Sequence, residues 1–166
     1  ATSQGNYIIT GIAVFSGNRM VGELDRHETY IFTLLGGGAT GLLTVPAGDD
    51  RIISFLQLNS KSKIHPKITP DGSIIFDVNI EARAMTVETN PSMGEIKLED
   101  KKRLDRMAGS YVKRETEKLL AKLQRLDSDP VGFGEKFRSR YPSQWEQLDW
   151  RHVFPQVKFN VNVKFN

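Results

Sequence analysis

The chain has 166 residues, of which 39% are hydrophobic and 26% charged, and these values are typical of a single globular domain with a sizeable core. Its formal net charge of +3 gives only weak support to nucleic acid or an anionic membrane as a partner. The chain has no cysteine, which excludes disulfides and thiolate metal sites, and it has no apolar run of about 18 residues that could span a bilayer.

The N-terminal half of the sequence predicts a hairpin, a helix and further strands. The segment "NYIITGIAVF" is apolar on both faces, as a central strand is, and the turn "SGNR" leads back into "MVGEL". Asp25 stands at an N-cap position with Glu28 three residues later, which predicts a helix over "RHETYIFTLL" that ends at Gly36. Two more strands are expected over "TGLLTV" and "RIISFLQLN".

A long strand, a long helix and a last strand follow. The segment "SIIFDVNIEARAMTVE" alternates apolar with polar residues, so one of its faces is expected to meet water. From about Glu99 to Leu126 apolar residues recur at helical spacing, and such a helix is roughly 40 Å long. The terminal segment "QVKFNVNVKFN" alternates strictly and predicts a half-buried strand. The order of elements predicts an α+β fold: a mostly antiparallel sheet covered on one face by helices, including one long helix.

The segment "DSDPVGFGEKFRSRYPSQW", residues 127–145, combines features of a phosphate loop and of a corner between helices. A phosphate loop follows a strand and precedes a helix, whereas "GFG" here follows the long helix. Asp129 before Pro130 instead predicts an N-cap with a proline in the first turn. Ser143 with Glu146 predicts a capping box at the start of the next helix. The segment is therefore interpreted as a structural corner.

Candidate catalytic and metal-binding residues are few. Asp127 and Asp129 could form a carboxylate pair for acid–base chemistry, but capping and the helix dipole explain aspartates beside a helix start better. His152 lies among aromatic residues and is expected to be packed, with one ring nitrogen hydrogen-bonded. No serine lies in a G-x-S-x-G motif, and the histidines have no metal-binding spacing. No catalytic, cofactor-binding or metal-binding residue is predicted, and the scattered histidines are His27, His65 and His152.

Two further segments could bind anions. The glycine-rich segment Gly36–Gly41 could form an anion nest, but Gly36 is explained by the helix end and the rest by a flexible loop. The basic segment "KSKIHPK", with Lys61, Lys63 and Lys67, could contact phosphates on RNA, DNA or lipid headgroups. It has no interleaved aromatic residues for base stacking, so it is interpreted as a solvated loop at a strand end. On these grounds the sequence predicts an interaction module.

Two stretches carry a resemblance to a known family. The first is the strand, turn, strand and helix start in "GIAVFSGNRMVGEL" and the "ET" that follows. In the second, a D-x-x-G-F-G corner leads to a Pro-x-x-Trp helix, a second tryptophan, a phenylalanine and an alternating final strand. Both resemble the C-subunits of spore germinant receptors, the Ger(x)C family. The matching residues of the second stretch are Asp129, Gly132, Phe133, Gly134, Pro142, Trp145, Trp150 and Phe154.

The resemblance implies a role that composition does not show. Proteins of this family are exported lipoproteins, attached to the spore inner membrane by an N-terminal lipidated cysteine. They act with two membrane subunits, A and B, in receptors that sense nutrients and trigger germination. The resemblance implies that residues 6–166 form the single C-terminal domain of such a subunit, non-catalytic and without cofactor, metal or nucleic acid. Residues 1–5 are interpreted as a cloning remnant, and the anchor is expected upstream of this chain.

Two other functions stay open at this point. One is a nucleic-acid or polyanion-binding module that uses Lys61, Lys63 and Lys67 with the basic side of the long helix. The other is a hydrolytic enzyme that uses Asp127 and Asp129. The sequence identifies neither the nutrient, nor the faces that meet other subunits, nor whether the domain self-associates.

Overall fold

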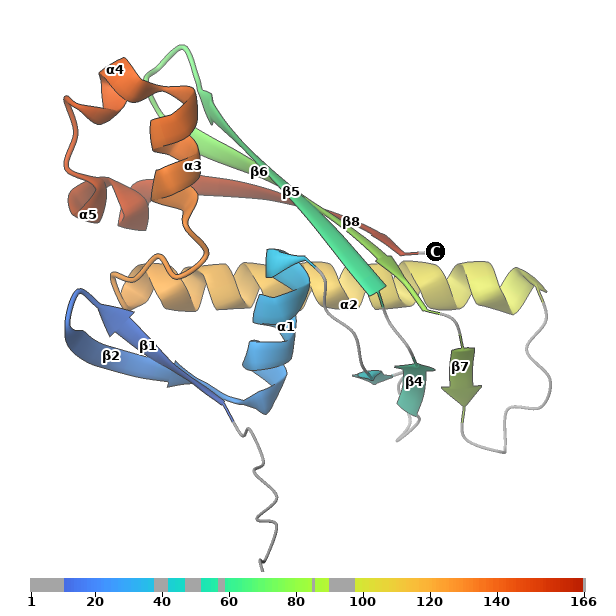
Figure 1. Cartoon of the computed structure of the whole chain (residues 1–166). Helices are drawn as coiled ribbons and strands as arrows, with labels where there is room; N and C mark the ends of the chain where they lie inside the picture. The colour runs from blue at the N-terminus through green and yellow to red at the C-terminus, as the bar shows by residue number, and fades with distance from the viewer. Residues whose placement is uncertain are drawn as a thin grey trace, which may run out of the picture.

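One long helix organises the molecule, and Figure 1 shows it running along the base of a twisted sheet. The computed structural model describes residues 11–37, 42–46, 52–56, 59–84, 86–89 and 98–165. In chain order the elements are β1 (Ile12–Ser16), β2 (Arg19–Leu24), α1 (Arg26–Gly36), β3 (Leu43–Pro46), β4 (Ile52–Leu56), β5 (Asn59–Ile68), β6 (Ile74–Arg83), β7 (Thr86–Thr89), α2 (Leu98–Arg125), α3 (Phe133–Arg140), α4 (Pro142–Trp145), α5 (Trp150–Val153), a 3-10 helix (Phe154–Gln156) and β8 (Lys158–Phe165).

The N-terminal hairpin and first helix form as the sequence predicts, with β1 and β2 paired antiparallel. The prediction of a central strand is wrong, because β2 is the one partner of β1 among the described strands and Phe15 is 52% exposed. The Asp25 carboxylate accepts from the backbone N–H of Glu28 at 2.8 Å, and the Glu28 carboxylate accepts from that of Asp25 at 2.9 Å. These two bonds complete the capping box and fix the start of α1. The helix ends at Gly36 as expected, but the residue with positive φ is Gly37. Residues 6–10 of the predicted first strand and residues 38–41 of the glycine segment lie outside the described residues.

The described strands belong to three sheets, where the sequence predicts one. β1 pairs with β2, β4 lies between β3 and β7, and β6 lies between β5 and β8. Only β6 and β8 pair in parallel, and the other described pairs are antiparallel. The parallel pair is a feature that sequence reasoning did not identify, because hairpin-like connections favoured antiparallel neighbours. The α+β class with mostly antiparallel pairing and covering helices is confirmed.

Two of these sheets share one strand register. In the smaller sheet Leu56 of β4 lies opposite Thr86 of β7, and in the larger sheet Asn59 of β5 lies opposite Arg83 of β6. Leu56 and Asn59 are three residues apart, and so are their partners Thr86 and Arg83, so the pairing register is the same in the two sheets. β4 lies within the predicted strand "RIISFLQLN", and β6 and most of β7 lie within the predicted strand "SIIFDVNIEARAMTVE".

β5 contradicts the prediction of a loop over "KSKIHPK". These residues lie inside a ten-residue strand that pairs with β6 along its whole length. β5 is an edge strand, and an edge position tolerates Pro66 because only one side of the strand needs to contribute hydrogen bonds to the sheet. Sequence reasoning interpreted the proline and the charges as loop signals, whereas they mark an edge. The exposed positions of this strand are Asn59, Lys61, Lys63, His65 and Lys67.

The core lies between α2 and the inner face of the sheet of β5, β6 and β8 (Figure 1). The apolar stripe predicted for the long helix is confirmed, and it packs against the inward residues of β6 and β8. Although α2 has 28 residues, no described helix is both long and apolar enough to cross a membrane. Buried residues of this core include Phe76, Val78 and Ile80 of β6, Val161 of β8, and Leu104, Ala108, Val112, Leu119, Leu120 and Leu123 of α2.

Neighbouring residues of β6 should respond very differently to truncation. Val78 is fully buried, whereas Asn79 lies on the outward face, so we expect Val78→Ala to lower the free energy of unfolding by about 2 kcal/mol or more and Asn79→Ala by less than about 1 kcal/mol. Urea unfolding of both variants measures this difference. Equal losses at the two positions would contradict the alternation that defines the inner face.

Candidate functional site

The two segments that carry the family resemblance meet in the structure. After α2, the hydroxyl of Ser128 donates to the backbone carbonyl of Phe15 in the hairpin at 2.6 Å. Gly22 of β2 faces Leu126 so closely that a Cβ at that position would lie 2.9 Å from a Leu126 methyl carbon. The N-terminal hairpin is therefore seated on the corner that follows the long helix, although more than 100 residues separate the two segments (Figure 1).

Asp129 organises this corner through one carboxylate. Its Oδ1 accepts from the backbone N–H groups of Gly132 at 3.0 Å and Phe133 at 2.9 Å. Its Oδ2 accepts from the N–H of Gly134 at 2.7 Å and from the indole N–H of Trp150 at 3.1 Å. Burial raises the pKa of Asp129 above its ordinary value, although these four donors favour the charged form. The carboxylate therefore accepts hydrogen bonds from the N–H groups at the start of α3 and from an indole N–H, and both of its oxygens are used in these bonds.

The predicted capping role of Asp129 is right, but its predicted position is wrong. The N-cap of α3 is Gly132, with φ of 79° and no side chain to accept a hydrogen bond. Asp129 lies three residues before that N-cap, and Pro130 lies in the turn between them, not in the first turn of the helix. A glycine tolerates positive φ without strain, which allows the turn to aim the first N–H groups of the helix at the aspartate.

Gly134 makes room for Trp150. A Cβ added at Gly134 would lie 2.6 Å from Trp150 Nε1 and 2.8 Å from Cε2, distances that real Cβ atoms do not reach. The missing side chain thus lets the indole lie against α3 and reach Asp129. Around it, aromatic rings pack at centroid distances of 4.8 to 6.4 Å, and such pairs contribute beyond their buried area. The rings in this cluster are Phe76, Phe133, Phe137, Tyr141, Trp145, Trp150, Phe154 and Phe159.

The structure does not bring Asp127 and Asp129 together as an acid–base pair. Asp127 has a left-handed backbone, with φ of 49°, and its carboxylate forms an exposed ion pair with Arg151 at 3.3 Å. Both aspartates border a cavity of 320 Å³ between the hairpin tip and the corner, but Asp129 turns its oxygens towards α3. One carboxylate is therefore paired in solvent while the other is used as a cap.

Two predictions about the last helices are wrong. Ser143 does not cap a helix: α4 begins at Pro142 with Tyr141 as an N-cap that makes no side-chain bond, and Ser143 lies inside it. His152 is not packed, because its side chain is 86% exposed, although its Nδ1 does bond to the Asp149 carboxylate at 2.8 Å. The Ser-x-x-Glu spacing at Ser143 and the aromatic neighbours of His152 were therefore misleading signals.

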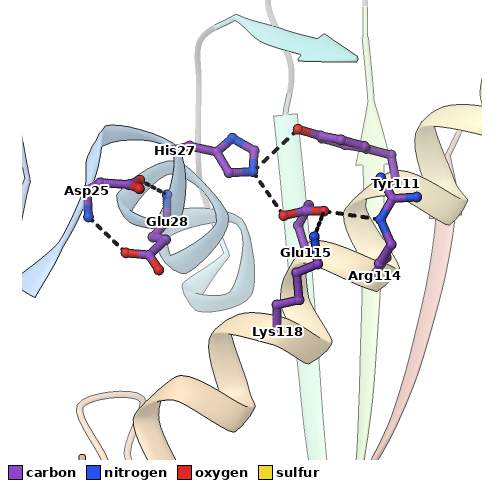
Figure 2. A network of polar contacts seen from close by, with 7 residues as sticks. All are labelled: Asp25, His27, Glu28, Tyr111, Arg114, Glu115 and Lys118. Atoms are coloured by element: carbon purple, nitrogen blue, oxygen red, sulfur yellow. Dashed lines mark hydrogen bonds and ion pairs between the residues drawn. The ribbon is translucent and has the colours of Figure 1, made fainter. Parts of the chain in front are cut away.

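A network of polar contacts joins α1 to α2, and Figure 2 shows His27 pointing from α1 towards Tyr111 and Glu115 of α2. His27 Nε2 lies 3.4 Å from the Tyr111 hydroxyl and 3.5 Å from a Glu115 carboxylate oxygen. Lys118 and Arg114 donate to the other Glu115 oxygen at 2.9 and 3.2 Å. Burial acts to raise the pKa of Glu115, but these two hydrogen bonds outweigh it, so the pKa lies below its ordinary value.

Within the described part of the chain, none of the histidines stands in a group that could hold a metal. His27 faces one carboxylate, His65 lies on the exposed face of β5, and His152 bonds to Asp149. Among the described residues no cluster of three or more histidines, aspartates or glutamates has metal-binding geometry.

The residues that position the corner carried no sequence signal of their own. They are Ser128, Arg151 and Gln124, whose amide donates to the carbonyls of Phe154 and Val157 at 2.9 and 3.0 Å.

Residues 10–166 match the model of a protein family described as "Spore germination B3/ GerAC like, C-terminal". The chain is 24% identical over 159 residues to Spore germination protein B3 of Bacillus subtilis (strain 168), covering 93% of this chain and 42% of that protein. It is 18% identical over 166 residues to Spore germination protein GerQC of Bacillus cereus, covering 98% of this chain and 46% of that protein. The chain therefore spans less than half of the length of these relatives.

The fold is similar to that in the crystal structure of the GerBC protein. The TM-score is 0.82 at 22% sequence identity, over 99% of this chain and 53% of that chain. At this identity the likeness establishes a shared fold.

Gly134→Ala should destabilise the corner. The new Cβ displaces Trp150 and weakens its bond to Asp129, so we expect the free energy of unfolding to fall by about 1–3 kcal/mol. Gly36→Ala is the matched control, because it adds the same methyl group where nothing lies within 4 Å, and we expect no loss of stability there. Denaturant unfolding followed by tryptophan fluorescence measures the stability of both variants. Equal changes in their free energy of unfolding would contradict the close packing of Trp150 on Gly134.

Glu115→Gln should cost stability at neutral pH and little in acid. Because the folded pKa of Glu115 lies below its unfolded value of 4.5, the charged form stabilises the fold above that pH. This contribution disappears as the pH falls through the folded pKa. Unfolding is measured at pH 7 and at the most acidic pH that preserves the fold. The difference in free energy of unfolding between wild type and variant should be smaller at the acidic pH. Glu117→Gln, at a side chain that is 48% exposed, is the control, and a pH-independent gap for Glu115→Gln would contradict the network.

Proposed function

The chain belongs to the spore germination B3/GerAC-like, C-terminal family, and on this premise we propose that it is the C-terminal domain of the C-subunit of a nutrient germinant receptor. The observation that carries the proposal is the length of the match, which runs from residue 10 to the last residue. The names of both curated relatives, which are spore germination proteins, support it. The whole domain from residue 6 to residue 166 is proposed to act as one unit.

We propose that the domain is not an enzyme. The two aspartates that could have formed an acid pair are engaged elsewhere, Asp127 by Arg151 and Asp129 by four donors. A general acid or base must be free to exchange a proton with a substrate, and Asp129 has both oxygens in structural hydrogen bonds. The domain therefore acts through contacts at its surface, in a receptor whose other members are the A and B membrane subunits.

The proposed location is the spore inner membrane. In this proposal a lipid anchor precedes the domain in the full subunit, and the domain lies on the membrane surface beside its partners. The family match supports a membrane-associated location in the spore. Nucleic-acid binding is not favoured, because the strand face of Lys61, Lys63 and Lys67 has no exposed phenylalanine, tyrosine or tryptophan for base stacking within the described residues, and His65 is its exposed aromatic ring.

Deletion of the gene should abolish germination in response to particular nutrients. In the organism that encodes the chain, spores of the deletion strain should still germinate with a trigger that bypasses nutrient receptors, and detergent extracts of wild-type spores should contain the subunit in complex with A and B subunits. Unchanged nutrient germination in a strain without paralogous receptors would overturn the proposal.

Complementation separates a docking role from a catalytic one. Asp127→Asn keeps a residue that tolerates the left-handed backbone while removing the charge, so the fold should be retained. If the subunit is non-catalytic, the variant restores nutrient germination to the deletion strain at wild-type rate. If spores carrying the variant contain normal amounts of the subunit but fail to germinate, an acid role for Asp127 gains support instead.

A further inference from the structure

The outward face of the sheet of β5, β6 and β8 is lined by polar side chains in register. Its middle rungs align His65 with Asp77 and Asn160, then Lys63 with Asn79 and Asn162, and then Lys61 with Glu81 and Lys164. The helices that contact this sheet pack on the other side, where the apolar residues of β6 are buried (Figure 1). The cations of this open face are Lys61, Lys63, Lys67, Arg83, Lys158 and Lys164, and its carboxylates are Asp77 and Glu81.

The net positive charge of this face is larger than that of the whole chain. Six cations against two carboxylates leave an excess of four positive charges, whereas the entire chain has a formal net charge of +3. The rest of the chain therefore sums to about one negative charge, and the basic character of the protein is concentrated on one side. Such a concentrated surface attracts anions over the distance at which salt does not yet screen it, roughly 10 Å at 0.1 M ionic strength.

Most of these cations have no partner in the described part of the chain. Lys67 forms an ion pair with Asp77, and Asn160 donates to the same carboxylate at 3.0 Å. In the next rung the Asn162 amide donates to the Asn79 carbonyl oxygen at 3.2 Å. The carboxyl and amide groups at the centre of the face are thus satisfied by one another, while the lysines at both edges point into solvent. β6 separates the lysines of β5 from those of β8, so no lysine of this face lies directly opposite another cation on a neighbouring strand.

The basic surface continues around the free edge of β5. Between β5 and α3 lies a groove of 660 Å³, into which Lys67, Lys136 and Arg140 project beside the hydroxyl-bearing Ser139 and Tyr141. Glu135 is the carboxylate of this groove, and both of its oxygens are bound by Arg138, at 2.8 and 3.0 Å. The groove therefore adds cations to the open face without adding a free carboxylate.

We propose that this basic face, the outward side of β5, β6 and β8 together with the groove beside α3, contacts the anionic headgroups of a lipid bilayer. The cations are spread over an extended face and do not converge on one point, which fits many headgroups better than one ligand. The large exposed apolar side chains of the described residues, Phe15, Met20, Leu42 and Ile52, lie on other strands, so the face has no apolar centre of the kind that protein interfaces have. Among the described residues of this face no phenylalanine, tyrosine or tryptophan side chain is exposed for base stacking, and His65 is its exposed aromatic ring. Binding is electrostatic, with each lysine adding independently.

The inference extends the proposed function in one respect. The choice of a bilayer as the anionic surface rests on the proposed membrane location, whereas the anion-binding character of the face rests on its charge alone. Contact through this face would hold the domain in one orientation, with the sheet against the membrane and α2 away from it. Its test uses the purified chain and synthetic lipids, so its outcome is independent of the germination assay.

Sedimentation with lipid vesicles tests the proposal. We expect the chain to bind vesicles of a roughly 2:1 mixture of phosphatidylcholine and phosphatidylglycerol and not to bind vesicles of pure phosphatidylcholine. Binding to the mixed vesicles should be several-fold weaker at about 200 mM salt than at about 50 mM. The triple variant Lys61→Gln, Lys63→Gln, Lys158→Gln removes three unpaired charges from the face and should lower the affinity roughly 100-fold. These exposed positions leave the core untouched, which circular dichroism and thermal unfolding verify.

A matched variant changes three lysines of α2 that are each paired with a carboxylate. Lys101, Lys113 and Lys118 contact Asp105, Glu117 and Glu115, and their side chains are at least half exposed. Their replacement by glutamine alters the net charge by the same amount but should change vesicle affinity only a few-fold. Equal losses in the two variants, salt-independent binding, or no binding to the anionic vesicles would overturn the proposal. Tighter binding to a DNA oligonucleotide or to polyglutamate than to the vesicles would also overturn it, in favour of a nucleic acid or an acidic protein.

Discussion

The half-buried carboxylate of Asp129 is the interaction on which the corner of this domain depends. A helix that begins with a glycine N-cap has no side chain of its own to accept from its first N–H groups, and unpaired buried donors are costly. Asp129 accepts from three of them and, with the same group, from the indole of Trp150. One side chain thereby fixes α3 against α5, and the aromatic cluster packs around the junction. The hairpin of β1 and β2 is then seated on the segment just before it.

This geometry explains why the residues that carry the family resemblance need no ligand. Gly132 adopts a left-handed backbone, Gly134 leaves space for an indole, and Phe154 fills the core. Each residue type follows from a turn, a close approach or a cavity to fill. The surfaces that remain available for function are therefore those that the corner does not use. They include the exposed hairpin tip at Phe15 and Met20, and the basic outer face of the sheet.

Regular patterns of apolar and polar residues were predictable from the sequence. Residues that are compatible with two local structures were not. The alternation in β6 and β8, the helical stripe of α2 and the Asp25 capping box each arise from residues that act on their immediate neighbours, so they were identified correctly. Pro66 was misread because proline disfavours a central strand but not an edge, and no single sequence says which strand lies at an edge. Asp129 was predicted as the N-cap itself, whereas it lies three residues before the N-cap Gly132, because the turn through Pro130 was predicted as the first turn of the helix. The site lacked a sequence signal at Ser128 and Arg151, whose partners are more than 20 residues away.

The parallel pairing of β8 with β6 has a consequence for how the chain reaches its native state. Ile75 lies beside Lys158 and Ala82 beside Phe165, so the third strand of the sheet joins across more than 80 residues of intervening chain. Contacts of such long range are made slowly, because the loop between them must close first. During synthesis the ribosome delivers β8 after every other described element, so the edge of β6 that pairs with β8 stays unpaired until then. We therefore expect this sheet to complete its folding only after β8 has been synthesised.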